Sequence, residues 1–125
     1  MAAIAKRSGA APSLASTLPP ANEVISGLLA GEDIEGGDLC EIASNGLVMK
    51  HTTGTPRGIA AVDASQGEAV TLYRNVRYGY GTGLTPGADV FASTTVDGGL
   101  DDDGGETGVA IGFCVDAERI QFTGL

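Results

Sequence analysis

The apolar residues after position 22 fall into short stretches separated by turn residues, and none has the length or the 3.6-residue period of a helix. This pattern predicts an all-β body made of short antiparallel strands. With so many short strands, the body is expected to be a small β-barrel or sandwich, because one open sheet would leave its edges exposed. The expected strands are 24–29, 38–43, 47–51, 58–62, 69–73, 89–92, 108–115 and 119–122.

The connections carry residues that favour tight turns. Asn45-Gly46 joins two expected strands, and Asn-Gly tolerates the positive φ angles of a short hairpin. The segments 64–67 and 85–88, which contain Gly67 and Pro86-Gly87, are expected to turn the chain into the strands that follow them.

The first 22 residues differ from the rest in composition. They are rich in Ala, Ser and Pro, and Pro19-Pro20 disfavours both helix and strand pairing. We therefore expect two parts, an extended N-terminal arm at 1–22 and a β-domain at 23–125. The arm is expected to bind a partner protein or to remain an unstructured tail. Its candidate contacts combine spaced apolar side chains with two cations: Ile4, Lys6, Arg7, Leu14 and Leu18.

Charge separates the same two parts. The chain has a net charge of −9, its 16 acidic residues all lie at or after Glu23, and the arm carries only Lys6 and Arg7. An acidic body disfavours direct contact with nucleic acid, which needs a positive patch. No apolar run approaches the roughly 20 residues that span a bilayer, so neither a membrane segment nor a secretion signal is expected.

Cys40 and Cys114 lie in apolar stretches and are expected to be two buried thiols of a protein made in a reducing compartment, although sequence leaves a disulfide between them open. His51 has no His or Cys at the spacing of a metal site or catalytic group. We therefore expect no enzyme activity, no cofactor and no metal.

Three motifs suggest chemistry and have simpler explanations. The acidic loop from Asp97 to Glu106 resembles a calcium loop but lacks the closing Glu of an EF-hand, so a solvated hairpin tip is expected. The glycines of 79–83 lack the flanking strand and helix of a phosphate loop. Met49-Lys50 is similar to the modified hairpin of biotin or lipoate carriers, but Lys50 does not lie at the Asn45-Gly46 tip.

Tyr78, Tyr80 and Arg77 form a candidate protein interface near Tyr73 and Arg74, because Tyr and Arg are common interface anchors. The alternative is that they are ordinary strand side chains.

The order of segments resembles the capsid decoration, or cement, proteins of tailed phages. The similar segments are Ala30-Gly-Glu-Asp-Ile-Glu-Gly-Gly-Asp-Leu-Cys-Glu-Ile42, Ser44-Asn-Gly-Leu-Val48, Arg57-Gly-Ile-Ala60, Gly67-Glu-Ala-Val-Thr-Leu72, Gly83-Leu-Thr-Pro-Gly-Ala-Asp-Val-Phe91, Gly108-Val-Ala-Ile-Gly-Phe-Cys-Val115 and Arg119-Ile-Gln-Phe122. The resemblance covers residues 23–125 and rests on their order, since no single segment is specific.

The resemblance implies a β-barrel that is made in the host cytoplasm, sits on the exterior of the virion and clamps neighbouring major capsid protein subunits. It also implies homotrimers at threefold or quasi-threefold axes, and no catalytic residues. Two other classes remain open: a β-barrel carrier or ligand-binding module, and a host-attachment or fibre-like virion protein.

Overall fold

The computed structural model describes residues 3–6, 11–12, 24–102 and 109–125. The described residues form eleven β-strands: β1 Ala11–Pro12, β2 Val24–Leu29, β3 Leu39–Ile42, β4 Val48–Lys50, β5 Gly58–Ala60, β6 Ala69–Tyr73, β7 Arg77–Gly79, β8 Asp89–Ala92, β9 Leu100–Asp101, β10 Gly112–Cys114 and β11 Arg119–Phe122. The all-β prediction is confirmed.

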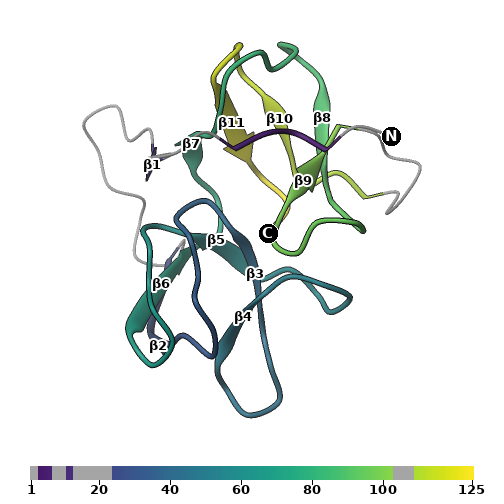
Figure 1. The fold of residues 1–125 in the computed structure, drawn as a ribbon. Helices are drawn as coiled ribbons and strands as arrows, with labels where there is room; N and C mark the ends of the chain where they lie inside the picture. Colours follow the sequence, from purple (N-terminus) through teal and green to yellow (C-terminus); the bar gives the residue numbers. More distant parts are fainter. Residues whose placement is uncertain (1–2, 7–10, 13–23, 103–108) are drawn as a thin grey trace.

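The strands form two sheets that lie one above the other in Figure 1. The upper sheet has the order β1-β7-β11-β10-β8-β9 and the lower sheet the order β2-β6-β5-β3-β4, with antiparallel pairing throughout. Within the described residues, the two edge strands of each sheet do not pair with each other, so neither sheet closes on itself. Of the two architectures expected from the sequence, the structure is therefore a small sandwich and not a closed barrel.

Side-chain alternation in the lower sheet divides the interior into two cores. Leu39 and Ile59 face the upper sheet, whereas the next residues along each strand, Cys40 and Ala60, face the opposite side. The inter-sheet core contains Leu39, Ile59, Val76, Tyr78, Tyr80, Leu84, Val90, Ala92, Leu100, Ile111, Cys114, Ile120 and Phe122. The second core contains smaller residues on average: Ala30, Ile34, Cys40, Val48, Ala60, Ala64, Val70 and Leu72.

The lower sheet is organised by a pair of interlocked turns, 30–38 and 60–68, which lie 30 residues apart and make equivalent contacts. Ile34 and Ala64 exchange backbone hydrogen bonds of 2.8 Å in both directions. Three further bonds of the first segment each have an equivalent in the second. Ala30 N donates to Glu68 O as Ala60 N donates to Asp38 O, and Gly37 N donates to Ala60 O as Gly67 N donates to Ala30 O. Within each turn, Asp38 N donates to Glu35 O as Glu68 N donates to Ser65 O. The two segments are thus related by a local pseudo-twofold axis.

Carboxylates complete this symmetry across the pair. The backbone N–H of Gly36 donates to Asp63 Oδ1 at 2.8 Å, and that of Gln66 donates to Asp33 Oδ1 at 2.9 Å. Each aspartate therefore caps the turn of the other segment.

The upper sheet repeats the arrangement with the segments 84–88 and 114–119. Leu84 N donates to Ala117 O, Gly87 N to Cys114 O, and Cys114 N to Ala88 O. Gly37, Gly67 and Gly87 occupy the same position in their turns with φ of 92°, 89° and 83°, a conformation that favours glycine.

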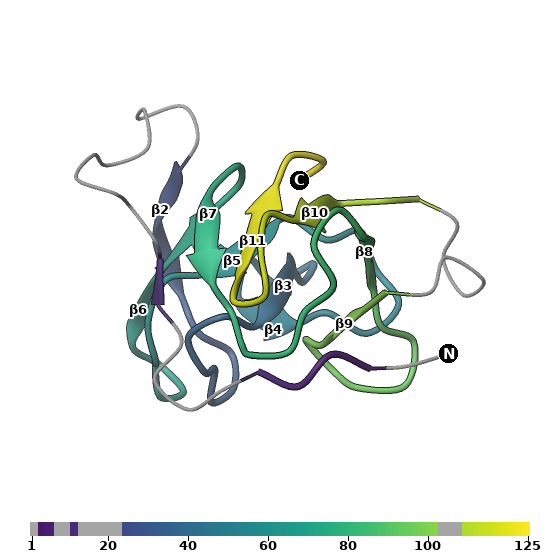
Figure 2. The ribbon, with the colours of Figure 1, turned by 90° about the horizontal axis from the view of Figure 1, so that it is seen from above.

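The described parts of the N-terminal segment bind the two margins of the upper sheet. Ala3 bridges Asp101, Ile4 N donates to Leu100 O at 3.1 Å, and β1 pairs with β7 at the other margin. Figure 2 shows residues 3–6 running past β9, and Figure 1 shows β1 next to β7. We call residues 3–6 the strap.

All eight expected strands are present. The expected bounds are exact for β2, β6, β8 and β11, whereas β3, β4, β5 and β10 are shorter than expected. The hairpin at Asn45-Gly46 is confirmed, since β3 pairs with β4 and Gly46 has φ of 85°. The turns at 64–67 and 85–88 are confirmed as well. The sequence did not indicate β1, β7 or β9, which are short and begin in segments expected to be arm, turn or acidic loop.

Candidate functional site

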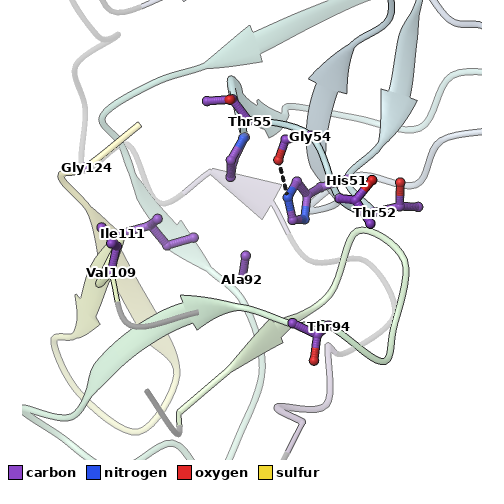
Figure 3. Close-up of a pocket in the computed structure, with 11 residues that line it drawn as sticks. His51, Thr52, Gly54, Thr55, Ala92, Thr94, Val109, Ile111 and Gly124 are labelled. Atoms are coloured by element: carbon purple, nitrogen blue, oxygen red, sulfur yellow. Dashed lines mark hydrogen bonds between the residues drawn. The ribbon is translucent and has the colours of Figure 1, made fainter. Parts of the chain in front are cut away.

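The strongest candidate site is a pocket of about 520 Å³ at the seam between the two sheets. Figure 3 shows its side chains converging from the loop after β4, from the region of β8 and from the segment before β10. The lining residues are His51, Thr52, Thr53, Gly54, Thr55, Pro56, Ala92, Thr94, Val109, Ile111 and Gly124. The volume lies within the range of ordinary ligand pockets.

The wall formed by the loop 51–56 is held in place by a carboxylate outside the pocket. Glu41 Oε1 accepts the backbone N–H groups of Thr52 at 2.8 Å and Gly54 at 3.2 Å. A Cβ at Gly54 would lie 2.7 Å from Glu41 Oε2, so a larger residue would require the carboxylate to shift. The loop is therefore ordered before any partner binds.

His51 connects this wall to both sheets. Its backbone N–H donates to Leu39 O, and its carbonyl oxygen accepts from Gly98 N, which lies between β8 and β9. The imidazole Nε2 lies 2.8 Å from the carbonyl oxygen of Gly54, as Figure 3 shows. Because a carbonyl only accepts, Nε2 carries the proton.

The other ring nitrogen of His51, Nδ1, is buried and has no hydrogen-bond partner among the described residues. A buried acceptor without a donor costs about 1–3 kcal/mol, and the bond from Nε2 to Gly54 O offsets part of this cost.

The pocket is also distinctive in its charge. None of the described lining residues is Asp, Glu, Lys or Arg, although the chain has 16 acidic and seven basic residues. At the rim, Val109 is 70% exposed. The sequence signal that indicates this wall is the uncharged run Thr-Thr-Gly-Thr-Pro directly after His51, which the motif analysis passed over.

Two of the residues expected to bind a partner through the arm are bound to the chain's own body. Ile4 packs against the inter-sheet core, and Lys6 Nζ forms ion pairs with Asp38 Oδ1 at 2.8 Å and Glu35 Oε1 at 2.7 Å. The Lys6 and Asp38 side chains are only 13% and 10% exposed. Arg7, Leu14 and Leu18 lie outside the described residues.

The expected tyrosine interface is wrong for both tyrosines. Tyr78 and Tyr80 are at most 1% exposed and pack edge to face in the inter-sheet core, with ring centroids 6.4 Å apart. Both rings point inward because a core with no Trp and few other aromatic residues uses them to fill the space between the sheets. Burial, with the nearby acidic residues second, raises the pKa of both phenols. Arg77 is half-buried and donates to Gln121 Oε1 at 3.3 Å.

The two cysteines are free and buried in different cores, as the sequence indicated. Burial raises the pKa of the Cys40 thiol to about 12 and also raises that of Cys114, so both thiols stay protonated at neutral pH.

The remaining motifs are placed as follows. In the acidic loop, Asp97 is exposed and Asp101 lies buried in β9, while Asp103 and Glu106 lie outside the described residues. Lys50 ends β4, away from the exposed tip at Asn45-Gly46. In the part of the chain that the structure describes, no three His, Cys, Asp or Glu side chains gather as a possible metal site.

The fold and the site define an all-β, two-sheet sandwich with a pocket at its seam whose described lining residues are uncharged. The described residues contain no helix long and apolar enough to cross a membrane. No protein-family model, curated protein or solved structure matches the chain.

Proposed function

We propose that this chain is a decoration protein that binds the outer surface of a mature tailed-phage capsid and cements neighbouring major capsid protein subunits. The observation that carries the proposal is the ordered series of segments that resembles this family. Three of these segments are turns followed directly by strands in the structure, at 35–38 before β3, 65–68 before β6 and 85–88 before β8. The proposal is supported to this extent, that three of the similar segments coincide with turn-and-strand units of the fold.

The proposed work is mechanical. Packaged DNA presses on the shell, and each bound decoration protein adds contact free energy that must be overcome before subunits separate. We propose that copies act as homotrimers at threefold or quasi-threefold axes on the virion exterior, so that modest contacts are multiplied by avidity. A net charge of −9 favours mutual repulsion of unbound copies in solution.

The strap changes how the arm is used in this proposal. Since Ile4 and Lys6 are engaged with the body, the apolar residues left for a capsid contact are Leu14 and Leu18. Deletion of residues 1–20 would remove the strap as well as the arm, so it would confuse loss of binding with loss of stability.

Leu14→Ser and Leu18→Ser together separate the two effects. We expect the double variant to bind expanded phage heads at least tenfold more weakly in co-sedimentation, with an unchanged melting temperature. Leu29→Ser, at another exposed leucine, is the matched control. Undiminished binding of the double variant would show that the arm is not a capsid contact.

A further inference from the structure

We infer that Lys6 and Asp38 are the two ends of an intramolecular isopeptide bond, which fixes the strap covalently to the body. The bond is an amide between Lys6 Nζ and Asp38 Cγ, and the ion pair of the structure is its unreacted state. The inference goes beyond the proposed function and does not depend on it, because all the reacting groups belong to this chain.

The amine and the carboxylate that would react are already in contact. Lys6 Nζ lies 2.8 Å from Asp38 Oδ1, and both side chains are largely buried. One of the chain's two lysines is therefore placed against a buried carboxylate. Two groups held together in this way react as if at very high concentration. Burial also restricts the access of water, which would hydrolyse the amide once it has formed.

The backbone holds both partners in position. The Asp38 Oδ2 atom accepts the backbone N–H of Glu35 at 2.8 Å, and the Asp38 N–H donates to the Glu35 carbonyl oxygen at 2.9 Å. Ile4 anchors the strap by packing against the inter-sheet core. A Cβ at Gly37 would lie 2.8 Å from Lys6 Cδ, so this glycine leaves room for the lysine stem beside the turn.

Glu35 is placed to carry the protons that the reaction must move. Its Oε1 lies 2.7 Å from Lys6 Nζ, the same nitrogen that contacts Asp38 Oδ1. Glu35 accepts one proton from Nζ, and the lone pair that this leaves on the nitrogen forms the bond to Asp38 Cγ. The negative charge that develops on Oδ2 is stabilised by the Glu35 N–H already bonded to it.

The second half of the reaction releases water. Glu35 passes its proton to Asp38 Oδ1, and a second proton from Nζ follows by the same route. The bond from Cγ to Oδ1 then breaks, and Oδ1 leaves as water. One of the three ammonium protons remains on the amide nitrogen, Glu35 ends as a carboxylate, and no oxidant or other reactant is consumed.

The bond would join the margins of the two sheets. The strap is bound to the upper sheet through Ile4 N and Leu100 O, whereas Asp38 ends a turn of the lower sheet. The cross-link closes a segment whose ends lie 32 positions apart, so it restricts the unfolded chain as a disulfide would.

The first test is the intact mass of the purified full chain, unfolded just before measurement. We expect a mass one water, about 18 Da, below that calculated for the same residues without a cross-link. Lys6→Arg keeps the positive charge and should abolish this deficit, whereas Lys50→Arg, the same exchange at the other lysine, should retain it. A wild-type mass without the deficit would overturn the inference. A deficit that persists in Lys6→Arg would do the same, because the water would then be lost elsewhere, for example at Asp97-Gly98.

The second test concerns the proton carrier. In samples taken at intervals after a short period of expression, the deficit should appear at least tenfold more slowly in Glu35→Gln than in wild type. Glu32→Gln is the matched control, since Glu32 lies in the same turn but accepts the backbone N–H of Lys50. An equal rate in both variants would overturn the role assigned to Glu35.

Discussion

The interlocked turns of the lower sheet and those of the upper sheet share a backbone plan but use different side chains. In the lower pair, Asp33 and Asp63 each cap the opposite turn. In the upper pair, Pro86 stands where Gly36 and Gln66 stand in the lower pair, and proline has no N–H to cap. Asp116, which lies in the second segment of the upper pair, instead accepts the N–H groups of its own segment at Glu118 and Arg119.

The two pairs of turns therefore share their backbone geometry. They differ in the cap, which depends on whether the second turn residue has an N–H. Where the second turn residue has an N–H, a carboxylate from the other segment binds it. Where proline removes the N–H, the carboxylate is available for a local ion pair with Arg119 at 2.7 Å.

The largest expected effect separates the two cores. Phe122→Ala empties part of the inter-sheet core and should lower the free energy of unfolding by about 3–5 kcal/mol. Val70→Ala in the second core removes only two carbons and should cost clearly less. Urea unfolding of both variants measures this, and equal losses would contradict the division into two cores.

The next effect concerns Asp38, the residue at which the lower pair departs from symmetry. The counterpart of Asp38 is Glu68, whose carboxylate accepts the N–H of Ser65 and makes no other described contact. The Asp38 carboxylate accepts the N–H of Glu35 and also forms an ion pair with Lys6. Lys6→Ala should cost about 3 kcal/mol, because it leaves a buried carboxylate without its cation. Lys50→Ala, which removes the same charge, is the control in thermal unfolding. A similar small loss in both variants would show that the strap adds no stability.

A double-mutant cycle tests the caps themselves. Asp33→Ala should cost about 1 kcal/mol in the wild-type background, since Gln66 N–H loses its acceptor. In a Gln66→Pro background, which imitates Pro86, the same substitution should cost almost nothing. Asp63→Ala removes the cap of a different turn, at Gly36. The loss of stability from Asp63→Ala should therefore be the same in both backgrounds. An unchanged cost of Asp33→Ala would contradict the role assigned to its carboxylate.

The smallest effect is the pH dependence from Asp116. Hydrogen bonds from Arg119 and Glu118 lower the pKa of this carboxyl from 3.8 to about 2. Its contribution is therefore complete above pH 4 and is lost as the pH falls from about 4 to about 2. The difference in melting temperature between wild type and Asp116→Asn should shrink across that window. A difference that stays constant from pH 6 to pH 2 would contradict this ion pair.

The sequence predicted those parts of the fold that depend on local patterns. Asn45-Gly46 and Pro86-Gly87 set their turns by backbone preference, and the strands after them follow from short apolar runs. The sequence also contains the 30-residue repeat, in which Ala30 matches Ala60, Asp33 matches Asp63 and Gly37 matches Gly67. Three identities are too few to identify a repeat without the hydrogen bonds of the structure.

The candidate site depends on contacts that no local pattern contains. Lys6 and Asp38 lie 32 positions apart, and the pocket joins residues from the loop after β4 to Ala92, Ile111 and Gly124. For Tyr78 and Tyr80 the sequence leaves both a surface anchor and an ordinary strand side chain open, because Tyr is common in both places. Only the position of the upper sheet shows that both face inward.

Co-sedimentation of the purified protein with expanded, undecorated phage heads, with unexpanded procapsids beside them, tests the central claim most directly. We expect saturable binding to expanded heads and none to procapsids. Failure to bind either particle would contradict the decoration function.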